Sequence, residues 1–356
     1  MTPLHPELGK IGVVLTGGFI RGAFQAGALK AMREYGIEPS YIVGVSVGAL
    51  NGAAFAIGRL GDLFTTYQEI APKPSKFLYD WNLFALFHAF TRSESVLTNR
   101  PLRRLLNDRI DLEPLLTVSV KVDIVTTDFQ TGGQVVFSNK NPEHQNVELL
   151  TDALLASAAM PIVFPPFIWQ GHQLFDGGIV EKNPLSYAIR EGCDTIFVIL
   201  TDAQEHIRTS RLFNTIYLIA RRAGNLISWR AAKKDLARGF EINNDIDSFE
   251  RLKRDLALIV DGGVAESASR TRIQEAITKR FTEAKFSFTG KRSVRIFVVE
   301  PAPTEENESY AMFRLHHHSV QGYLEDGYGK MVETIRAIGE ERGPRGESNE
   351  NPAAGI

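Results

Sequence analysis

The residue with the clearest chemical potential in this sequence is Ser46, which lies between two glycines in the stretch "GVSVG". Three interpretations are open: a membrane helix with a G-x-x-x-G face, a buried helix start packed on small residues, or the G-x-S-x-G turn of a serine hydrolase. The membrane interpretation is weak, because Ser46 and Asn51 interrupt a run made largely of Gly, Ala and Val. In the hydrolase interpretation, Gly44 and Gly48 permit a tight strand-to-helix turn that exposes the serine hydroxyl.

A nucleophilic serine needs a base, and the sequence offers two candidates. Asp176 lies in "LFDGGIVEKNP", at the end of an apolar pair and before two glycines. An Asp-Gly-Gly can be a plain turn, but a lone carboxylate within hydrogen-bond reach of a serine can also act as its base. The run His316, His317 and His318 follows the serine, as the histidine of many hydrolases does. No turn or strand signal positions one of these rings, so a solvated loop or an adventitious metal contact is the simpler interpretation.

A glycine-rich connection, "LTGGFIRGAF" at residues 15–24, joins a strand to a helix. Its free backbone N–H groups are suited to bind an anion or an oxyanion. The loop lacks the G-K-[ST] ending of a nucleotide-binding P-loop, and Phe19 breaks the dinucleotide-binding pattern. Arg21 places one fixed cation beside the loop.

The elements around these residues predict a parallel sheet with helices on its faces. Short apolar runs predict strands, and helical spacing follows the first two of them. The predicted strands are residues 11–15, 41–45, 120–128, 195–200 and 295–301, and the predicted helices include 23–36 and 322–338. About ninety residues between the last two strands have a helix-compatible pattern and predict a helical insertion.

The composition is that of an ordinary globular protein, with 44% hydrophobic and 23% charged residues. A net charge of −2 gives no reason to expect nucleic acid as a partner. The single cysteine, Cys193, excludes an internal disulfide framework and favours a reducing compartment. No signal peptide or transmembrane segment is visible, so we expect a cytoplasmic protein with peripheral membrane contact at most. We expect no cofactor and no metal site.

Taken together, these elements resemble the patatin-like phospholipases, a family of lipid acyl hydrolases. "LTGGFIRG" is similar to the family's L-[ST]-G-G-G-x-[RK]-G loop, and "GVSVG" to its nucleophile elbow. The segments "VTTDFQTGG", "ASAAMPIVFPPF" and "FDGGIVEKNP" also have counterparts in the family, in the same order along the chain.

The resemblance implies a three-layer α/β/α fold with a mostly parallel central sheet. We expect a single patatin-like domain over residues 1–340, with a helical insertion at about 204–290. Residues 341–356 are polar and rich in Gly and Pro, and we expect them to be disordered.

The resemblance also implies a Ser-Asp dyad in place of a triad. The roles carried over are Ser46 as nucleophile, Asp176 as base, the N–H groups around Gly17, Gly18 and Phe19 as the oxyanion hole, Arg21 as the residue that orients this loop, and Gly44 and Gly48 as the elbow glycines. One departure stands out, because the family has a glycine where this chain has Phe19. Either Phe19 occupies that place under strain or it shapes the acyl pocket.

The expected function is hydrolysis of ester bonds in phospholipids, lysophospholipids or glycerides through an acyl-enzyme on Ser46. An acyltransferase using the same dyad and a non-catalytic lipid-binding module are the alternatives, and only Phe19 favours the second. Two segments could contact a lipid surface. Residues 77–90 are rich in aromatic side chains and predict an amphipathic helix, as a lid or as a packed cap; residues 221–234 are basic and fit either anionic headgroups or water.

Overall fold

The computed structural model describes residues 8–70, 77–81, 94–203, 216–263, 267–283, 293–302 and 317–340. The strands are β1 (Ile11–Leu15), β2 (Tyr41–Val45), β3 (Asp80–Trp81), β4 (Leu97–Thr98), β5 (Lys121–Asp128), β6 (Gln134–Ser138), β7 (Phe167–Trp169), β8 (His172–Asp176), β9 (Thr195–Ile199) and β10 (Arg295–Val299). The main helices are α1 (Gly22–Glu34), α2 (Val47–Ala56), α3 (Leu60–Ile70), α6 (Arg100–Leu105), α7 (Val147–Ser157), α8 (Leu185–Arg190), α9 (Ile216–Gly263), α10 (Ser267–Glu283) and α11 (His317–Glu340).

The central sheet is mostly parallel, as the sequence predicts. Strands β10, β9, β1, β2 and β5 lie side by side in that order, and each pairs parallel with its neighbour. Every residue of β1, β2 and β9 is buried, because helices cover both faces of the sheet. The carboxyl ends of these strands therefore share one edge of the sheet, where α1 and α2 begin.

The other edge of the sheet is antiparallel and is organised by the long strand β5. Up to Val125, β5 pairs with β2, and from Thr126 onward it pairs with β8. Strand β6 pairs with β5 across both stretches, so it occupies the opposite side of β5. Strand β8 therefore continues beyond the end of β2, on the same side of β5. Strand β7 completes the edge by pairing with β8.

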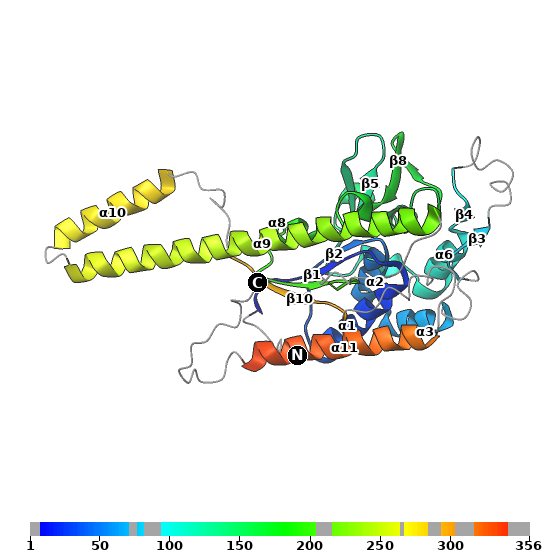
Figure 1. Cartoon of the computed structure of the whole chain (residues 1–356), viewed down its shortest axis with the longest axis horizontal. Helices are drawn as coiled ribbons and strands as arrows, with labels where there is room; N and C mark the ends of the chain where they lie inside the picture. Colours follow the sequence, from blue (N-terminus) through cyan, green and yellow to red (C-terminus); the bar gives the residue numbers. More distant parts are fainter. Residues whose placement is uncertain are drawn as a thin grey trace.

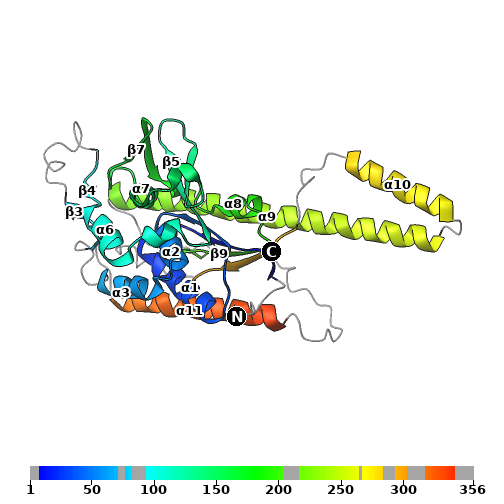
Figure 2. The ribbon, with the colours of Figure 1, turned by 180° about the vertical axis from the view of Figure 1, so that it is seen from behind.

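Helices cover the sheet in two layers. Helices α1, α2, α3 and α11 lie on one side, and α8 and the first half of α9 lie on the other (Figures 1 and 2). The α1–α11 contact is close because of two glycines. A Cβ on Gly27 would overlap Leu324 O, and one on Gly327 would overlap Phe24 O. The domain is an α/β sandwich with helices outside and the sheet between them.

Helix α9 is the longest element, and its second half extends beyond the rest of the molecule (Figure 1). Leu236 is buried, and Gly239 lies against Leu185 of α8 and Ile296 of β10. Asn243 exchanges hydrogen bonds with the backbone of Val294, at 2.6 and 3.2 Å. Past this point α10 packs beside the helix. Among the described helices, none combines the length and hydropathy needed to cross a bilayer.

One expected element differs from the sequence prediction. Residues 77–90 do not form one continuous helix, because Asp80–Trp81 forms β3 and pairs antiparallel with β4. Backbone pairing with β4 replaces the helical hydrogen bonds at this point. Residues 82–90 lie outside the described part of the chain, as do the expected tail at 341–356 and His316.

Candidate active site

Ser46 lies at a sharp turn between β2 and α2. Its backbone has φ 56° and ψ −128°, a left-handed conformation that is strained for a residue with a side chain. A Cβ on Gly44 would lie 2.5 Å from the backbone nitrogen of Ala49, and one on Gly48 would overlap Leu15 O. Both glycines are therefore needed for the turn to pass between the strand and its neighbours.

A buried serine holds this turn against the sheet. The Ser46 backbone N–H donates to Ser157 Oγ at 2.8 Å, and the Ser157 hydroxyl donates to Val125 O at 2.7 Å. Ser157 is the last residue of α7 and is completely buried. Its hydroxyl satisfies one donor and one acceptor that would otherwise be buried without partners. Ser157 lies in the segment "ASAAMPIVFPPF", and no local pattern in the sequence predicts its role.

The register of β5 brings Asp176 to Ser46. Val125 pairs with Val45 at the end of β2, and the next residue, Thr126, pairs with Asp176 at the end of β8. The two strands meet end to end along β5, so the residue after Val45 faces Asp176. The Ser46 hydroxyl lies close enough to the Asp176 carboxylate to lower the pKa of that carboxyl.

The Asp176 carboxyl is buried, and nearby polar and charged groups offset part of the effect of burial on its pKa. Burial raises its pKa to about 6, while the Gly178 N–H, the Ser46 hydroxyl and the positive charge of Lys182 act in the opposite direction. The Gly178 N–H donates to Asp176 Oδ1 at 2.8 Å, and Thr127 Oγ1 donates to Asp176 O at 2.9 Å. A carboxylate with a pKa of about 6 can take a proton from a hydroxyl and return it near neutral pH.

The glycine-rich loop lies beside Ser46. A Cβ on Gly17 would come within 3.0 Å of Ser46 Cβ, so only glycine leaves the serine room. Thr201 fixes the loop, because its hydroxyl donates to Gly17 O at 2.6 Å and its side chain fills the space where a Gly18 Cβ would be. Within the described residues, the N–H groups of Gly17, Gly18 and Phe19 have no hydrogen-bond partner. They are open donors next to the serine.

Phe19, the residue that departs from the glycine pattern, adopts a left-handed backbone with φ 56°. Its side chain is half-buried and packs against the hydrophobic core. The backbone is therefore in the glycine-favoured region, as the strain alternative predicts, and the ring packs against the core. The acyl-pocket role of Phe19 stays a prediction.

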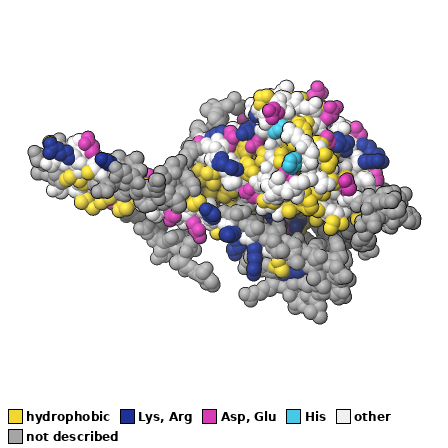
Figure 3. Space-filling view, turned by 90° about the horizontal axis from the view of Figure 1, so that it is seen from above, with side chains coloured by type: hydrophobic (Ala, Val, Ile, Leu, Met, Phe, Trp, Pro, Cys, Tyr) yellow, Lys and Arg dark blue, Asp and Glu magenta, His cyan; other side chains and the backbone are white. Residues whose placement is uncertain are grey.

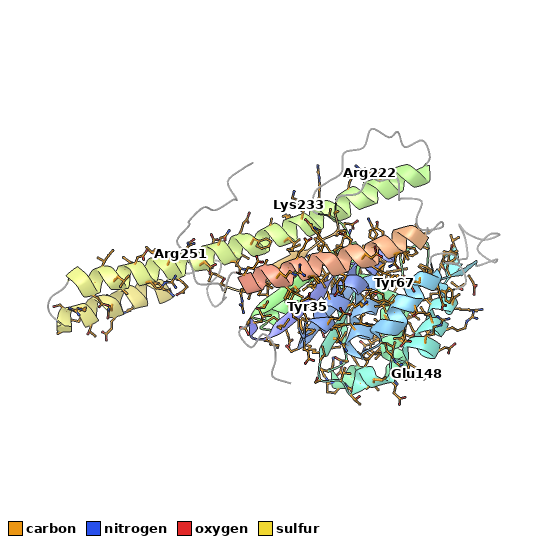
Figure 4. The ribbon with its side chains drawn as sticks, turned by 90° about the horizontal axis from the view of Figure 1, so that it is seen from below. Tyr35, Tyr67, Glu148, Arg222, Lys233 and Arg251 are labelled. Atoms are coloured by element: carbon orange, nitrogen blue, oxygen red, sulfur yellow. The ribbon has the colours of Figure 1, made fainter. Side chains whose placement is uncertain are left out.

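A buried polar network lies beneath the loop. Gln25 Nε2 donates to Thr16 O at 2.8 Å and to Ile199 O at 3.0 Å. Asn51 Nδ2 donates to Gln25 Oε1 and to Gly22 O, and the hydroxyl of Tyr67 donates to Asn51 Oδ1 (Tyr67 is labelled in Figure 4). Each amide is satisfied, so the network fixes the loop in one position.

Arg21 is held by an acidic residue that sequence analysis missed. Asp202, three residues after β9, forms an ion pair with Arg21 and a second one with Lys182 Nζ at 2.6 Å. Burial would raise the pKa of Asp202, but the charges and hydrogen bonds of Arg21 and Lys182 lower it to about 2. Lys182 follows the Asp-Gly-Gly turn, so Asp202 joins the glycine-rich loop to the segment that carries Asp176. The position of Asp202, just after the carboxyl end of the strand predicted at 195–200, is the sequence signal that could have identified it.

The histidines do not enter this site within the described structure. His172 begins β8, and its Nδ1 lies 3.0 Å from Asp128 Oδ2, on the hairpin beyond Asp176. His317 and His318 begin α11, and their side chains lie outside the description. The described residues contain no group of three or more His, Cys, Asp or Glu side chains arranged to hold a metal ion.

Residues 13–189 match the sequence profile of the family described as patatin-like phospholipase. The chain carries a patatin-like phospholipase domain. The matched region includes the glycine-rich loop, the Ser46 turn, β5 and Asp176, whereas Thr201, Asp202 and α9 lie beyond it.

Two curated proteins illustrate the relatives of this patatin-like domain. The chain is 29% identical over 195 residues to neuropathy target esterase sws of Drosophila melanogaster, covering 55% of this chain and 13% of the relative. It is 27% identical over 189 residues to lysophospholipase nte1 of Aspergillus terreus, covering 53% and 12%. The alignments thus span about an eighth of each relative.

A solved structure, VipD from Legionella pneumophila, aligns with 92% of this chain and 67% of its own. The TM-score of the alignment is 0.39 and the sequence identity is 14%.

Proposed function

We propose that this patatin-like domain is a serine lipid acyl hydrolase that works through a Ser46–Asp176 dyad. The observation that carries the proposal is the proximity of the Ser46 hydroxyl, at a strained strand-to-helix turn, to the buried Asp176 carboxylate, whose pKa is raised to about 6. The names of the two relatives, an esterase and a lysophospholipase, favour a lipid ester as the substrate class.

The first half of the reaction forms an acyl-enzyme. Ser46 Oγ attacks the ester carbonyl carbon while its proton passes to Asp176. The negative charge that develops on the carbonyl oxygen is stabilised by the open N–H groups of Gly17, Gly18 and Phe19. As the ester C–O bond breaks, the protonated Asp176 returns its proton to the departing alcohol.

The second half releases the fatty acid. Water attacks the acyl-enzyme carbonyl, and Asp176 accepts a proton from it. The same N–H groups stabilise the second oxyanion before Ser46 leaves with the proton from Asp176. Arg21 contributes by holding the loop that supplies the donors, through its ion pair with Asp202 and a bond from Nε to Gly18 O at 3.4 Å.

Release of fatty acid from a panel of phospholipids, lysophospholipids and neutral glycerides tests the proposal. We expect the wild-type chain to hydrolyse at least one class and Ser46→Ala to be inactive on all of them. A fluorophosphonate probe should label the wild type and leave Ser46→Ala unlabelled. Product analysis with an added alcohol or thiol acceptor distinguishes hydrolysis from acyl transfer. An unlabelled wild-type chain that releases no fatty acid would indicate a binding module and refute the proposal.

A further inference from the structure

The exposed face of α9 carries charges of both signs in two separate blocks. Arg230, Lys234 and Arg238 are exposed and four residues apart, and Glu241 and Asp245 follow them on the same face. At 100° per residue, all five lie within an arc of about 80°. Buried Leu236 points away from this arc, toward the body of the domain. The five charges therefore face outward.

Among the residues that the structure describes, none of these five side chains has an ion-pair partner. Like charges four residues apart on a helix repel each other, and here the three cations and the two anions each do so. Residues 216–240 hold six Lys and Arg side chains and one Asp, in a chain with a net charge of −2. Figure 4 labels Arg222, Lys233 and Arg251 along this helix. Only Arg238 and Glu241, three residues apart, bring opposite charges of this set near each other within the helix.

The second half of α9, from residue 244, forms with α10 an arm that projects from the body (Figures 1 and 2). Gln274 of α10 donates to Asp261 Oδ1 at 3.0 Å, which ties the two helices together. Four large apolar side chains on the arm face solvent: Leu252 is 49% exposed, Leu258 70%, Ile259 66% and Ile273 of α10 39%. Yellow apolar and dark blue basic side chains are both visible on the arm in Figure 3. Leu252 and Ile259 lie on the same helix face as Lys234 and Asp245.

We propose that α9 is the interface of a homodimer, in which the α9 helices of two chains pack antiparallel along this charged face. The charge pattern is self-complementary about a two-fold axis between residues 239 and 240. In that register Lys234 of each chain faces Asp245 of the partner subunit, and Arg238 faces Glu241 of the partner subunit. Like-charge repulsion within each helix becomes attraction between helices.

The same register explains the length of α9. A helix of 48 residues is about 70 Å long, and among the described helices α10 is the one that packs beside roughly its second half. In the antiparallel dimer, the arm of one chain lies along the first half of the partner's α9. Leu252 and Ile259 are thereby removed from water, which is the usual reason for exposed apolar side chains in a row. A second copy of the chain therefore accounts for the charges and for two of the exposed apolar side chains, Leu252 and Ile259. The proposal does not depend on the hydrolase activity.

Sedimentation equilibrium and light scattering on the full chain test the interface. We expect the wild type to have twice the 39.6 kDa mass of one chain at high concentration and to dissociate on dilution. Lys234→Glu and Asp245→Lys should each weaken the dimer about tenfold or more, because each substitution places like charges together at two symmetric contacts. The double variant Lys234→Glu/Asp245→Lys should restore the dimer, and mixing the two single variants should give heterodimers.

Arg254→Glu is the matched control. It makes the same change of charge on an exposed residue of α9, about 160° around the helix from Lys234, so it should leave the dimer unchanged. A wild type that stays monomeric at every concentration would overturn the proposal, as would single and double variants that dimerise equally well. The main alternative is that the basic residues bind anionic lipid headgroups. Sedimentation with vesicles of phosphatidylcholine and phosphatidylserine tests it. If the monomeric protein binds these vesicles and Lys234→Glu abolishes the binding, the face contacts lipid headgroups and the dimer proposal is overturned.

Discussion

The backbone N–H of Ser46 is hydrogen-bonded to the side-chain hydroxyl of Ser157, a residue 111 positions away in the sequence. The same hydroxyl continues to Val125 O, so one small side chain connects the turn, α7 and β5. The position of the proposed nucleophile depends on this bridge as well as on the glycines of its own turn.

Ser157→Ala should therefore lower both stability and rate. Two buried polar groups lose their partner, which should reduce the free energy of unfolding by about 1–3 kcal/mol. A displaced Ser46 should reduce kcat by about 10- to 100-fold with less change in KM. Rates are normalised to the fraction of enzyme that a fluorophosphonate labels. Thr151→Val is the matched control, since the Thr151 hydroxyl on the same helix bonds only to Val147 O at 2.8 Å. Equal kcat values for Ser157→Ala and wild type would contradict the positioning role.

Asp176→Asn should abolish hydrolysis, because it preserves shape and removes basicity. In the wild type, kcat/KM should fall on the acid side with an apparent pKa of about 6, since only the ionised Asp176 can accept the serine proton. Replacing His316, His317 and His318 together should leave most of the activity. The pH–rate profile and fatty acid release measure both effects. An active Asp176→Asn enzyme beside a dead histidine variant would replace the dyad with a Ser-Asp-His triad.

The raised pKa of Asp176 also predicts a gain in stability for the inactive variant. In the unfolded chain an Asp ionises near pH 3.8, whereas in the folded chain it stays protonated up to about pH 6. The folded state thus binds more protons between these values, so this group makes stability fall as pH rises from about 4 to 6. Above pH 6 its full effect is a loss of about 3 kcal/mol. Asp176→Asn should consequently melt at a higher temperature than wild type at pH 8, with the difference vanishing near pH 4. Equal melting temperatures at pH 8 would contradict this.

Lys182 and Asp202 should move the acid limb of the pH–rate profile in opposite directions. Lys182→Gln removes a positive charge that lowers the pKa of Asp176, so the limb should shift above pH 6. Asp202→Asn removes the negative charge that neutralises Lys182 and Arg21, so the limb should shift below pH 6 and kcat should fall as the loop loosens.

Glu191→Gln is the control for this pair. Glu191 likewise bridges two cations, Lys10 at 3.0 Å and Lys121 at 2.6 Å, but it does so near the amino ends of the strands. Its replacement should leave the acid limb in place. Shifts of the same sign for Lys182→Gln and Asp202→Asn would show that the two residues act on folding and not on the charge at Asp176.

Phe19 allows backbone strain and ring packing to be measured separately. Phe19→Ala keeps a side chain in the left-handed region and loses the ring, whereas Phe19→Gly loses the ring and relieves the strain. The Gly variant should therefore be about 1–2 kcal/mol more stable than the Ala variant in thermal melts. If the ring shapes the acyl pocket, both variants should shift their preference toward bulkier acyl chains on a series of esters. A faster Phe19→Gly enzyme with unchanged chain preference would exclude the pocket role.

Local patterns in the sequence were sufficient to predict the parallel strands and the Ser46 turn. The glycines that mark the turn lie two positions on either side of the serine, and the strands are short apolar runs. The base was identified through the resemblance to the family. The residues around Asp176 alone are equally consistent with a plain turn.

The rest of the site depends on pairings that no local pattern contains. Strand β5 changes its neighbour from β2 to β8 after Val125. This exchange depends on the register of three strands that are far apart in sequence. Asp202 belongs to no recognised motif, and its ion pairs to Arg21 and Lys182 are formed only in the folded chain. The amphipathic helix expected at 77–90 shows the converse, because aromatic spacing alone did not reveal the pairing of Asp80–Trp81 with β4.

The exchange of partners along β5 has a consequence for folding. Val45 and Asp176 come together only after a loop of about 130 residues has closed, and the entropy of closing such a loop must be overcome before the contacts that reward it can form. Helices α1 and α2 and the β1–β2 pair involve much nearer residues and can form earlier. During refolding, helical circular dichroism should thus recover before esterase activity or fluorophosphonate labelling does. A folding intermediate would therefore contain these helices and still lack hydrolytic activity.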